Sequence, residues 1–416
     1  MKVGIVPVLD RSWGGVYQYS VTFLHALARL ESDDEFVVFA PKGVELADDV
    51  RALPFEIAEM PFGPSRLGGM WSRLPEPMRV PLRRLVASMR TRRPSSAPQG
   101  SRWPEWFASL DLDLLIFTIE DDRAQGSGVP YVVVLHDIQH KLQPDLPEFA
   151  DRAESERRER RVRSSVHGAT LVLVDSETGR EDVVSCYADT GTTVDDVWPL
   201  PFVPAHYVSA LVPEEQRREV RARLALPASY LFYPAQFWPH KNHERIIESL
   251  GKLAGEGLRV PLVLVGSNAG SALRAETFAT MTAAVDRLGV ADLVHYLGYV
   301  PDADMSALYA MATALVMPTF FGPTNIPVVE AWELGCPVVT SDIRGIREQV
   351  GDAALLVDPS SVDSIAEGIR RVVQDADLRW QLIERGRARL SAYTMDDFVI
   401  RLGEILDEVG RRIATR

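Results

Sequence analysis

Residues 320–340 read FFGPTNIPVVEAWELGCPVVT, which combines a glycine-containing loop, an apolar helix and a short β-strand. Pro327 suits the first helical turn, where its missing N–H costs no hydrogen bond, and Gly335 suits the helix end. Free backbone N–H groups at such a helix start can bind an anion. Glu330 lies about one turn into the helix, where a carboxylate suits sugar or ribose hydroxyls. The stretch indicates a nucleotide-sugar site. In the alternative interpretation, the Glu330 carboxylate only stabilises its own helix by interacting with the helix dipole.

Outside this stretch, short apolar runs alternate with helical segments along almost the whole chain. Apolar runs bounded by turns are typical of parallel strands that helices cover on both faces. The alternation predicts an α/β fold with two doubly wound, Rossmann-like domains that face each other across a cleft. The expected strands are Val3–Leu9, Phe36–Ala40, Leu114–Thr118, Tyr131–Leu135 and Leu171–Asp175, then Tyr230–Pro234, Leu262–Gly266, Leu293–Leu297, Ala314–Met317 and Pro337–Thr340.

The proline-rich stretch Trp198–Pro204 reads as an extended linker, which places the boundary between the domains within residues 200–215. A length of 416 residues agrees with two domains. We therefore expect a first domain over residues 1–205 and a second over residues 206–395.

The first domain contains an insertion at about residues 60–104 that is rich in proline, glycine and arginine. Between Arg66 and Arg102 there are nine arginines and one acid, Glu76, which gives a local charge of +8. Within it, Val80–Met89 could form a short amphipathic helix. Two readings stay open: an element that contacts anionic lipid or the acceptor, and a solvated insertion.

Composition and charge exclude several classes of function. The formal net charge of −13 argues against nucleic acid as a partner. The two cysteines, Cys186 and Cys336, match no metal or redox spacing. The start MKVGIVPVLDRSWGG reads as a strand and a glycine turn rather than a signal peptide, and no apolar run approaches the ~20 residues that span a bilayer. We expect a cytoplasmic enzyme, with contact to the inner membrane face left open.

Polar groups follow two strands of the first domain. The sequence SWGGVY, with Gly14 and Gly15, follows the first strand and begins a helix expected at Val16–Leu30. His136 and Asp137 follow the strand YVVVL. Doubly wound sheets bind ligands at the carboxyl ends of their strands, so both groups are site candidates. His136 could bind a hydroxyl group or transfer a proton; a loop histidine that caps backbone groups is the alternative.

The second domain adds a cation and further turns. Lys241 is a compact charge that suits a diphosphate, and Asn242 can cap the helix that follows it. Gly266 lies in a glycine turn after a strand, and backbone groups near Val300 could bind the edge of a base.

Other charged clusters read as structural. Asp302 and Asp304 resemble a metal-binding pair only superficially, because they suit a helix N-cap and first turn. Asp111 and Asp113 suit a turn before a strand. Asp151–Val166 reads as an exposed helix with many salt bridges along it. We therefore expect no metal site.

The HisLysAsn sequence at His240–Asn242 and the later block ProThr…Pro…GluAla…GlyCysProVal resemble the family 4 (group 1) retaining glycosyltransferases with the GT-B fold. The resemblance covers almost the whole chain and is strongest in the second domain. It implies that a terminal helix at about residues 396–416 packs back on the first domain.

The same resemblance implies roles for the candidate residues. Lys241 would bind the diphosphate, Glu330 the ribose, and His136 would lie near the transferred sugar, so these three are the expected catalytic group. The remaining donor-binding candidates are Gly15, Gln236, Gly266, Val300, Gly322, Thr324, Asn325 and Ile326, and the acceptor candidates are His136, Asp137 and Gly14.

Two positions depart from the family pattern. Gly322 stands where the family usually has a glutamate, eight residues before Glu330, and Gln236 stands where it usually has a phosphate-binding arginine. A subgroup in which Asn325 and Gln236 take over hydrogen bonding is one explanation. An enzyme with reduced activity or none is the other.

The resulting hypothesis is a metal-independent, retaining glycosyltransferase that needs no cofactor and uses a nucleoside diphosphate sugar as co-substrate. Its acceptor would be a glycan, a lipid-linked glycan or a small molecule. The basic Arg66–Arg102 segment favours cell-envelope polysaccharide or lipid-linked glycan synthesis, and high arginine and alanine usage points to a bacterial source. The alternatives are a sugar-nucleotide epimerase and a degenerate, nucleotide-binding subunit, because fold alone does not fix function.

Overall fold

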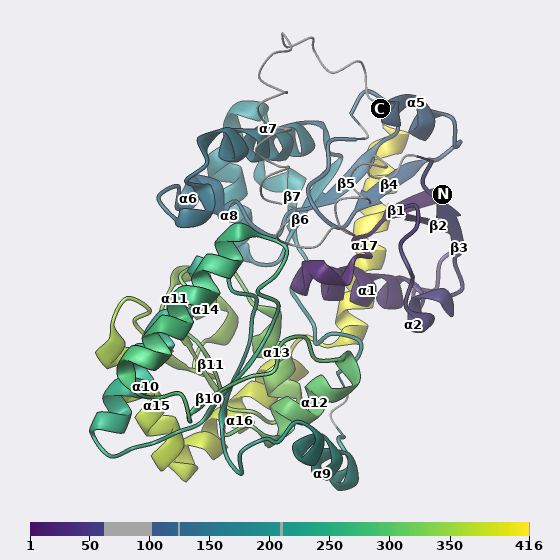
Figure 1. Ribbon diagram of the computed structural model, residues 1–416. Coiled ribbons are helices and arrows are strands. Elements are labelled where there is room, and N and C mark those ends of the chain that lie inside the picture. Colours follow the sequence, from purple (N-terminus) through teal and green to yellow (C-terminus); the bar gives the residue numbers. More distant parts are fainter. Residues whose placement is uncertain (62–101, 124, 209–210, 416) are drawn as a thin grey trace.

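The computed structural model describes residues 1–61, 102–123, 125–208 and 211–415, and it contains two parallel β-sheets in two separate domains (Figure 1). Residues 62–101 lie outside the described part, and with them the expected helix at Val80–Met89 and most of the basic insertion.

The first sheet has seven parallel strands in the order β3-β2-β1-β4-β5-β6-β7. Its strands are β1 (Lys2–Val6), β2 (Glu35–Ala40), β3 (Glu56–Glu59), β4 (Leu114–Phe117), β5 (Tyr131–Val134), β6 (Leu171–Val174) and β7 (Val197–Pro199). Val3 lies opposite Phe36 on one side and Leu114 on the other. The strand order reverses between β1 and β4, so the carboxyl end of β1 lies at the crevice where doubly wound sheets bind ligands.

Both faces of this sheet are buried, which explains the near-continuous apolar sequences of its strands. Leu114 and Ile116 belong to one core cluster, while the intervening Leu115 and Phe117 belong to another. The helices of this domain are α1 (Gly15–Leu27), α2 (Asp48–Arg51), α5 (Trp103–Ala108), α6 (Gln139–Leu142), α7 (Arg152–Gly168) and α8 (Glu177–Tyr187).

The second sheet has six parallel strands in the order β10-β9-β8-β11-β12-β13. The strands are β8 (Leu231–Pro234), β9 (Leu262–Val265), β10 (Val294–Tyr296), β11 (Ala314–Met317), β12 (Val338–Ser341) and β13 (Leu355–Val357). The helices are α9 (Glu214–Arg223), α10 (His243–Gly255), α11 (Ala272–Leu288), α12 (Asp302–Met311), α13 (Ile326–Glu333), α14 (Arg344–Val350), α15 (Val362–Gln374) and α16 (Ala376–Ser391).

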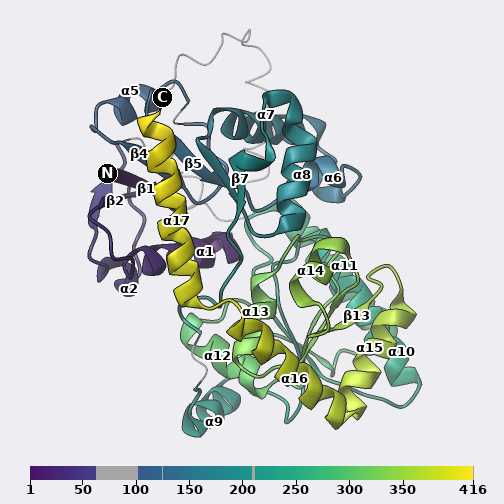
Figure 2. The ribbon, with the colours of Figure 1, turned by 180° about the vertical axis from the view of Figure 1, so that it is seen from behind.

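The last helix, α17 (Met395–Ala414), leaves the second domain and runs along the first (Figure 2). It packs against α1, and its buried Leu402, Ile405 and Val409 join the core that contains Val3 and Leu24. Within the described part of the chain, none of the helices combines the length and apolar character that crossing a bilayer requires.

The prediction of two Rossmann-like α/β domains is confirmed, and each expected strand is present. Ala314–Met317 has the expected bounds, and the other strands have one or both ends shifted. The boundary at residues 205 and 206 stays a prediction. The linker prediction for Trp198–Pro204 was wrong at its start, because Trp198 and Pro199 belong to β7. β7 is an edge strand, which tolerates a proline. Strands β3 and β13 are further edge strands that the sequence reasoning missed.

Two helix predictions also need correction. The helix expected at Val16–Leu30 spans Gly15–Leu27. Asp302 is the first residue of α12 rather than its N-cap, which is Pro301, and the Asp302 carboxylate accepts a hydrogen bond from Gln18 in the first domain. Asp304 does lie in the first turn, paired with Arg223.

Candidate active site

The carboxyl ends of the two sheets open onto one cavity of about 620 Å³ between the domains. Every site candidate named from the sequence lines it: Gly14, Gly15, His136, Asp137, Gln236, Lys241, Gly266, Val300, Gly322, Thr324, Asn325, Ile326 and Glu330. The structure therefore brings the candidates together, while the role of each stays a prediction.

The glycine loop before α1 packs directly on the second domain. Gly14 is the N-cap residue of α1 and has φ of +58°, a conformation that glycine adopts at little cost. A Cβ at Gly14 would lie 3.2 Å from Gln236 Nε2. That amide nitrogen donates to Ser12 O (2.8 Å), and Gln236 Oε1 accepts from Trp238 Nε1 (3.1 Å). Gln236 therefore already bridges the two domains, which limits what its amide can offer to a ligand.

His136 and Asp137 are held by different partners. His136 Nε2 donates to the carbonyl of Thr118 (2.9 Å), and burial lowers the pKa of the imidazole. The ring is therefore neutral at pH 7, with Nδ1 as an unprotonated acceptor for a hydroxyl group. Asp137 accepts from Arg158 (2.6 Å). Burial alone would raise the pKa of Asp137, but the charge of Arg158 and the Gln139 N–H bring it below its usual value.

Lys241 lies at the end of a short 3₁₀ turn, Pro239–Lys241. Among the described residues its ammonium group has neither an ion pair nor a hydrogen bond. Burial lowers the pKa of Lys241 to about 8, although the charges of Asp137 and Glu148 oppose this change. A half-buried cation without a counter-ion is suited to bind an anion.

The segment that carries Lys241 is fixed from both domains. Glu148 Oε1 in the first domain accepts from the backbone N–H and from Nδ1 of His240, each at 2.8 Å. The prediction that Asn242 caps α10 was wrong, because its side chain makes no capping bond. Its amide instead donates to the carbonyls of Pro318 (2.8 Å) and Pro359 (2.7 Å), which ties the turn to neighbouring loops.

Glu330 is buried in α13, with 4% of its surface exposed. Oε1 accepts from the Tyr207 hydroxyl (2.8 Å) and Oε2 accepts from the Tyr309 hydroxyl (2.6 Å). Burial raises the pKa of the Glu330 carboxyl, and these two hydrogen bonds offset part of the rise. Each carboxylate oxygen keeps a further lone pair for a ligand hydroxyl.

The GPTN loop explains why glycine occupies position 322. Gly322 has φ of +139°, and a Cβ there would lie 2.8 Å from Nδ2 of Asn325. Asn325 is 6% exposed, and its Nδ2 has no acceptor among the described residues. A larger residue at 322 and the present Asn325 orientation exclude each other, so Gly322 and Asn325 form one unit that leaves an amide donor at the cavity.

The start of α13 offers fewer free N–H groups for an anion than the sequence indicated. The backbone N–H of Asn325 donates to Gln349 Oε1 (3.0 Å), and Pro327 has no N–H. Thr324 is also engaged: its hydroxyl donates to Oδ2 of Asp175 in the first domain (2.5 Å).

Several cavity groups were missed from the sequence. Asp175 follows β6 as His136 follows β5, so the same strand-end signal could have identified it. Burial raises the pKa of Asp175 to about 7, although hydrogen bonds from Thr324 and Ser176 oppose this rise. Tyr207 and Tyr309 carried no signal, because their partner is distant in sequence. The helix expected to be an exposed salt-bridged element, α7, supplies Arg158 to the site as well.

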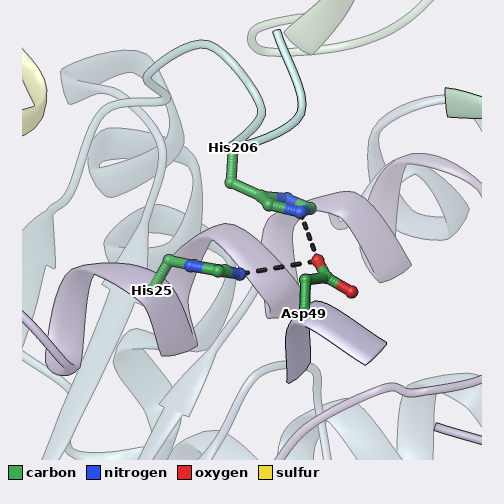
Figure 3. Close-up of side chains that lie close together, drawn as sticks. All are labelled: His25, Asp49 and His206. Carbon is green, nitrogen blue, oxygen red and sulfur yellow. Dashed lines mark hydrogen bonds and ion pairs between the residues drawn. The ribbon is translucent and has the colours of Figure 1, made fainter. Parts of the chain in front are cut away.

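A separate cluster joins His25, Asp49 and His206 beside the interdomain segment (Figure 3). Asp49 Oδ2 lies 2.5 Å from His206 Nε2 and 3.5 Å from His25 Nε2. The two rings are stacked, with centroids 4.4 Å apart and planes 11° apart. Imidazole binds a metal through a lone pair in the ring plane, and stacked parallel planes do not share such a point. The geometry therefore favours a hydrogen-bonded cluster that holds the segment leading to Tyr207.

The architecture is that of the GT-B fold, as comparison with solved structures shows. Sucrose-phosphate synthase from Thermosynechococcus elongatus superposes with a TM-score of 0.68 at 15% identity, covering 99% of this chain and 100% of that one. HepE from Anabaena, solved with UDP and glucose, superposes with a TM-score of 0.69 at 17% identity, covering 98% and 99%.

The sequence is similar to a family model and to glycosyltransferases of known name. Residues 216–389 match the family model described as "Glycosyl transferases group 1". The O-antigen chain mannosyltransferase B of Escherichia coli is 28% identical over 64% of this chain and 67% of its own length. A D-inositol 3-phosphate glycosyltransferase of Frankia alni is 24% identical over 65% of this chain and 66% of its own length. The chain therefore has the GT-B fold and is similar to group 1 glycosyltransferases over most of its second domain.

Proposed function

We propose that the protein transfers a sugar from a nucleoside diphosphate sugar to an acceptor hydroxyl, with retention and without a metal ion. The observation that carries this proposal is the joint presence, in one interdomain cavity, of the Glu330 carboxylate and of the Lys241 ammonium, which has no partner among the described residues. A cation suits the diphosphate, and a carboxylate suits the ribose hydroxyls. Relatives include HepE, which was solved with UDP-glucose.

In this mechanism the acceptor hydroxyl attacks on the face from which the diphosphate leaves, and the leaving diphosphate accepts its proton. Lys241 and the N-terminus of α1 at Gly15 stabilise the charge that develops on the leaving group. His136 Nδ1 accepts a hydrogen bond from a sugar hydroxyl. The bridges made by Gln236 and Glu148 hold the domains together around the substrates and limit hydrolysis.

We propose a glycan or lipid-linked glycan of the cell envelope as the acceptor, since the E. coli relative is an O-antigen chain mannosyltransferase. The enzyme would then work in the cytoplasm at the inner membrane face, where the nine arginines between Arg66 and Arg102 could contact anionic lipid. Cosedimentation with phosphatidylglycerol vesicles, against phosphatidylcholine vesicles, tests the membrane contact.

A thermal-shift panel of UDP, GDP, ADP and dTDP tests the donor site, since a ligand that binds only the folded state raises its stability. One nucleotide should raise the midpoint, and Lys241→Ala and Glu330→Ala should reduce the effect. Incubation with the matching sugar donors then separates the rivals. Nucleotide binding without transfer to any acceptor would favour the degenerate subunit, and a new sugar nucleotide formed without acceptor would favour the epimerase. Anomeric proton couplings in the product report retention or inversion.

A further inference from the structure

Arg274, in the first turn of α11, is a buried cation without a counter-ion. It is 8% exposed, and within the described ranges its guanidinium makes no ion pair or hydrogen bond, with Nε buried and unsatisfied. Other arginines of the domain pair with carboxylates, as Arg259 does with Asp292. Arginine cannot shed its proton, and burial of an uncompensated charge is costly. Of its three nitrogens only Nε is buried without a partner, and the ring of Trp238 contacts the guanidinium, so the terminal Nη groups remain able to donate to an anion.

The surroundings of Arg274 connect it to the wall of the cavity. Its guanidinium lies over the ring of Trp238, 5.2 Å from the centroid. Trp238 lines the cavity and donates to Gln236, which also lines it. Arg274 thus lies one side chain behind the cavity wall, on the same side as Gln236.

The glycine turn after β9 covers Arg274 from the other direction. Gly270 has φ of +88°, and a Cβ there would lie 2.3 Å from Arg274 Nη2. A side chain at position 270 would displace the guanidinium, so the glycine permits this close approach. Gly266 and Ser267 of the same turn line the cavity. A modest movement of this turn would open a path from the guanidinium to the cavity.

We propose that Arg274 binds a phosphate oxygen of the nucleoside diphosphate when the donor occupies the cavity. This inference rests on the proposed function. A diphosphate carries more charge than Lys241 alone neutralises, and Gln236 adds no charge. Arg11 lines the cavity from the first domain, and Arg274, behind the Trp238 wall, would add a cation from the second domain. A planar guanidinium can hold two phosphate oxygens at once.

Titration calorimetry with UDP, GDP, ADP and dTDP, each compared with its nucleoside and with inorganic pyrophosphate, tests the inference. Arg274→Met removes the charge but keeps much of the side-chain length. Arg287→Met is the matched control, because Arg287 lies in the last turn of the same helix, is exposed and pairs with Glu248. Arg274→Gln serves as a second uncharged variant if the methionine variant does not fold.

The variant should weaken binding of the diphosphate that the wild type prefers by about 10- to 100-fold, as expected for the loss of charge-assisted hydrogen bonds. Binding of the nucleoside should not change, and the salt dependence of diphosphate binding should become shallower. Pyrophosphate binding reduced in parallel would place the contact on the phosphates alone. Arg274→Lys should restore part of the loss.

Unchanged diphosphate binding in Arg274→Met would overturn the inference and leave the proposed function intact. An equal loss of nucleoside and diphosphate binding would also overturn it, because it would indicate a packing role beneath Trp238. A wild type that binds none of the four diphosphates would overturn the proposed function, and this inference with it.

Discussion

Replacing Lys241 with methionine should stabilise the ligand-free protein at pH 7. Burial lowers the pKa of Lys241 from 10.5 to about 8. Lowering a pKa by one corresponds to about 1.4 kcal/mol, so the charged lysine costs the folded state up to about 3 kcal/mol at pH values below 8. Since the side chain is only half-buried, this value is a ceiling. Methionine has a similar length and no charge, so the variant avoids the cost.

The pH dependence of stability provides a second test. A lysine whose folded pKa is depressed binds fewer protons in the folded than in the unfolded state between pH 8 and 10.5. Wild-type stability should therefore gain a contribution as pH rises through this window, and the variant should lack it. Urea denaturation at pH 7, 8, 9 and 10, followed by tryptophan fluorescence, measures both curves.

Ligand should reverse the order of stability. A nucleoside diphosphate at about 1,000 times its dissociation constant stabilises the wild type by about 4.1 kcal/mol, which exceeds the largest cost expected for the charged lysine. The variant should gain much less at the same concentration, because the ammonium is lost. Lys252→Met is the control, since Lys252 is exposed and pairs with Asp363. A variant that is less stable than the wild type at pH 7, or that gains as much from the ligand, would refute the reasoning.

Three further substitutions test other parts of the site. Gly322→Ala should lower the free energy of unfolding in urea by about 1–3 kcal/mol, because the site has a left-handed φ and a Cβ there would lie 2.8 Å from Asn325. The control, Gly255→Ala, has open space around it and should be neutral. Equal effects would contradict the crowding argument. The pKa of Asp175 is about 7 in the folded state, above its usual value of 3.8, so the folded state binds more protons between these pH values and wild-type stability should fall as pH rises through them, by at most about 4 kcal/mol. Asp175→Asn should remove this fall. Parallel pH profiles of stability for the two proteins would rule this out. Tyr309→Phe should lower the free energy of unfolding by about 1–3 kcal/mol, because it removes a hydrogen bond to the buried Glu330 carboxylate. Tyr230→Phe should lower it less, because the Tyr230 hydroxyl donates to a neutral carbonyl. The reverse order would count against a charged Glu330 in the folded protein.

The fold could be predicted well from the sequence because the signals were local. Strands such as Leu114–Phe117 are short apolar runs, and they remain recognisable wherever the chain places them. Edge strand β3 escaped because its sequence, EIAE, is half charged, and β13 escaped because it is only three residues long.

The site could be predicted where a residue follows a strand, as for His136, or begins a helix, as for Gly15. Groups that act through distant partners could not be identified in this way. Tyr207 and Glu330 are 123 residues apart, and Glu148 and His240 are 92 apart, so only the tertiary structure reveals these hydrogen bonds. Asn242 does occupy the N-cap position of α10, but its backbone is left-handed (φ of 60°) and its Oδ1 accepts from Arg245 instead of a helix N–H. Neither feature could be read from the local sequence.

The chain passes between the domains twice, once between β7 and α9 and once between α16 and α17. Two domains joined by two segments can rotate relative to each other most readily about the axis through both connections, which then act as hinges. Tyr207 lies on the first connection and donates to Glu330. We expect this contact to change little, while Trp13 and Tyr299, which are exposed and line the cavity mouth, move further. Substrate entry would then be controlled at the mouth, and the ribose end of the site would stay assembled throughout.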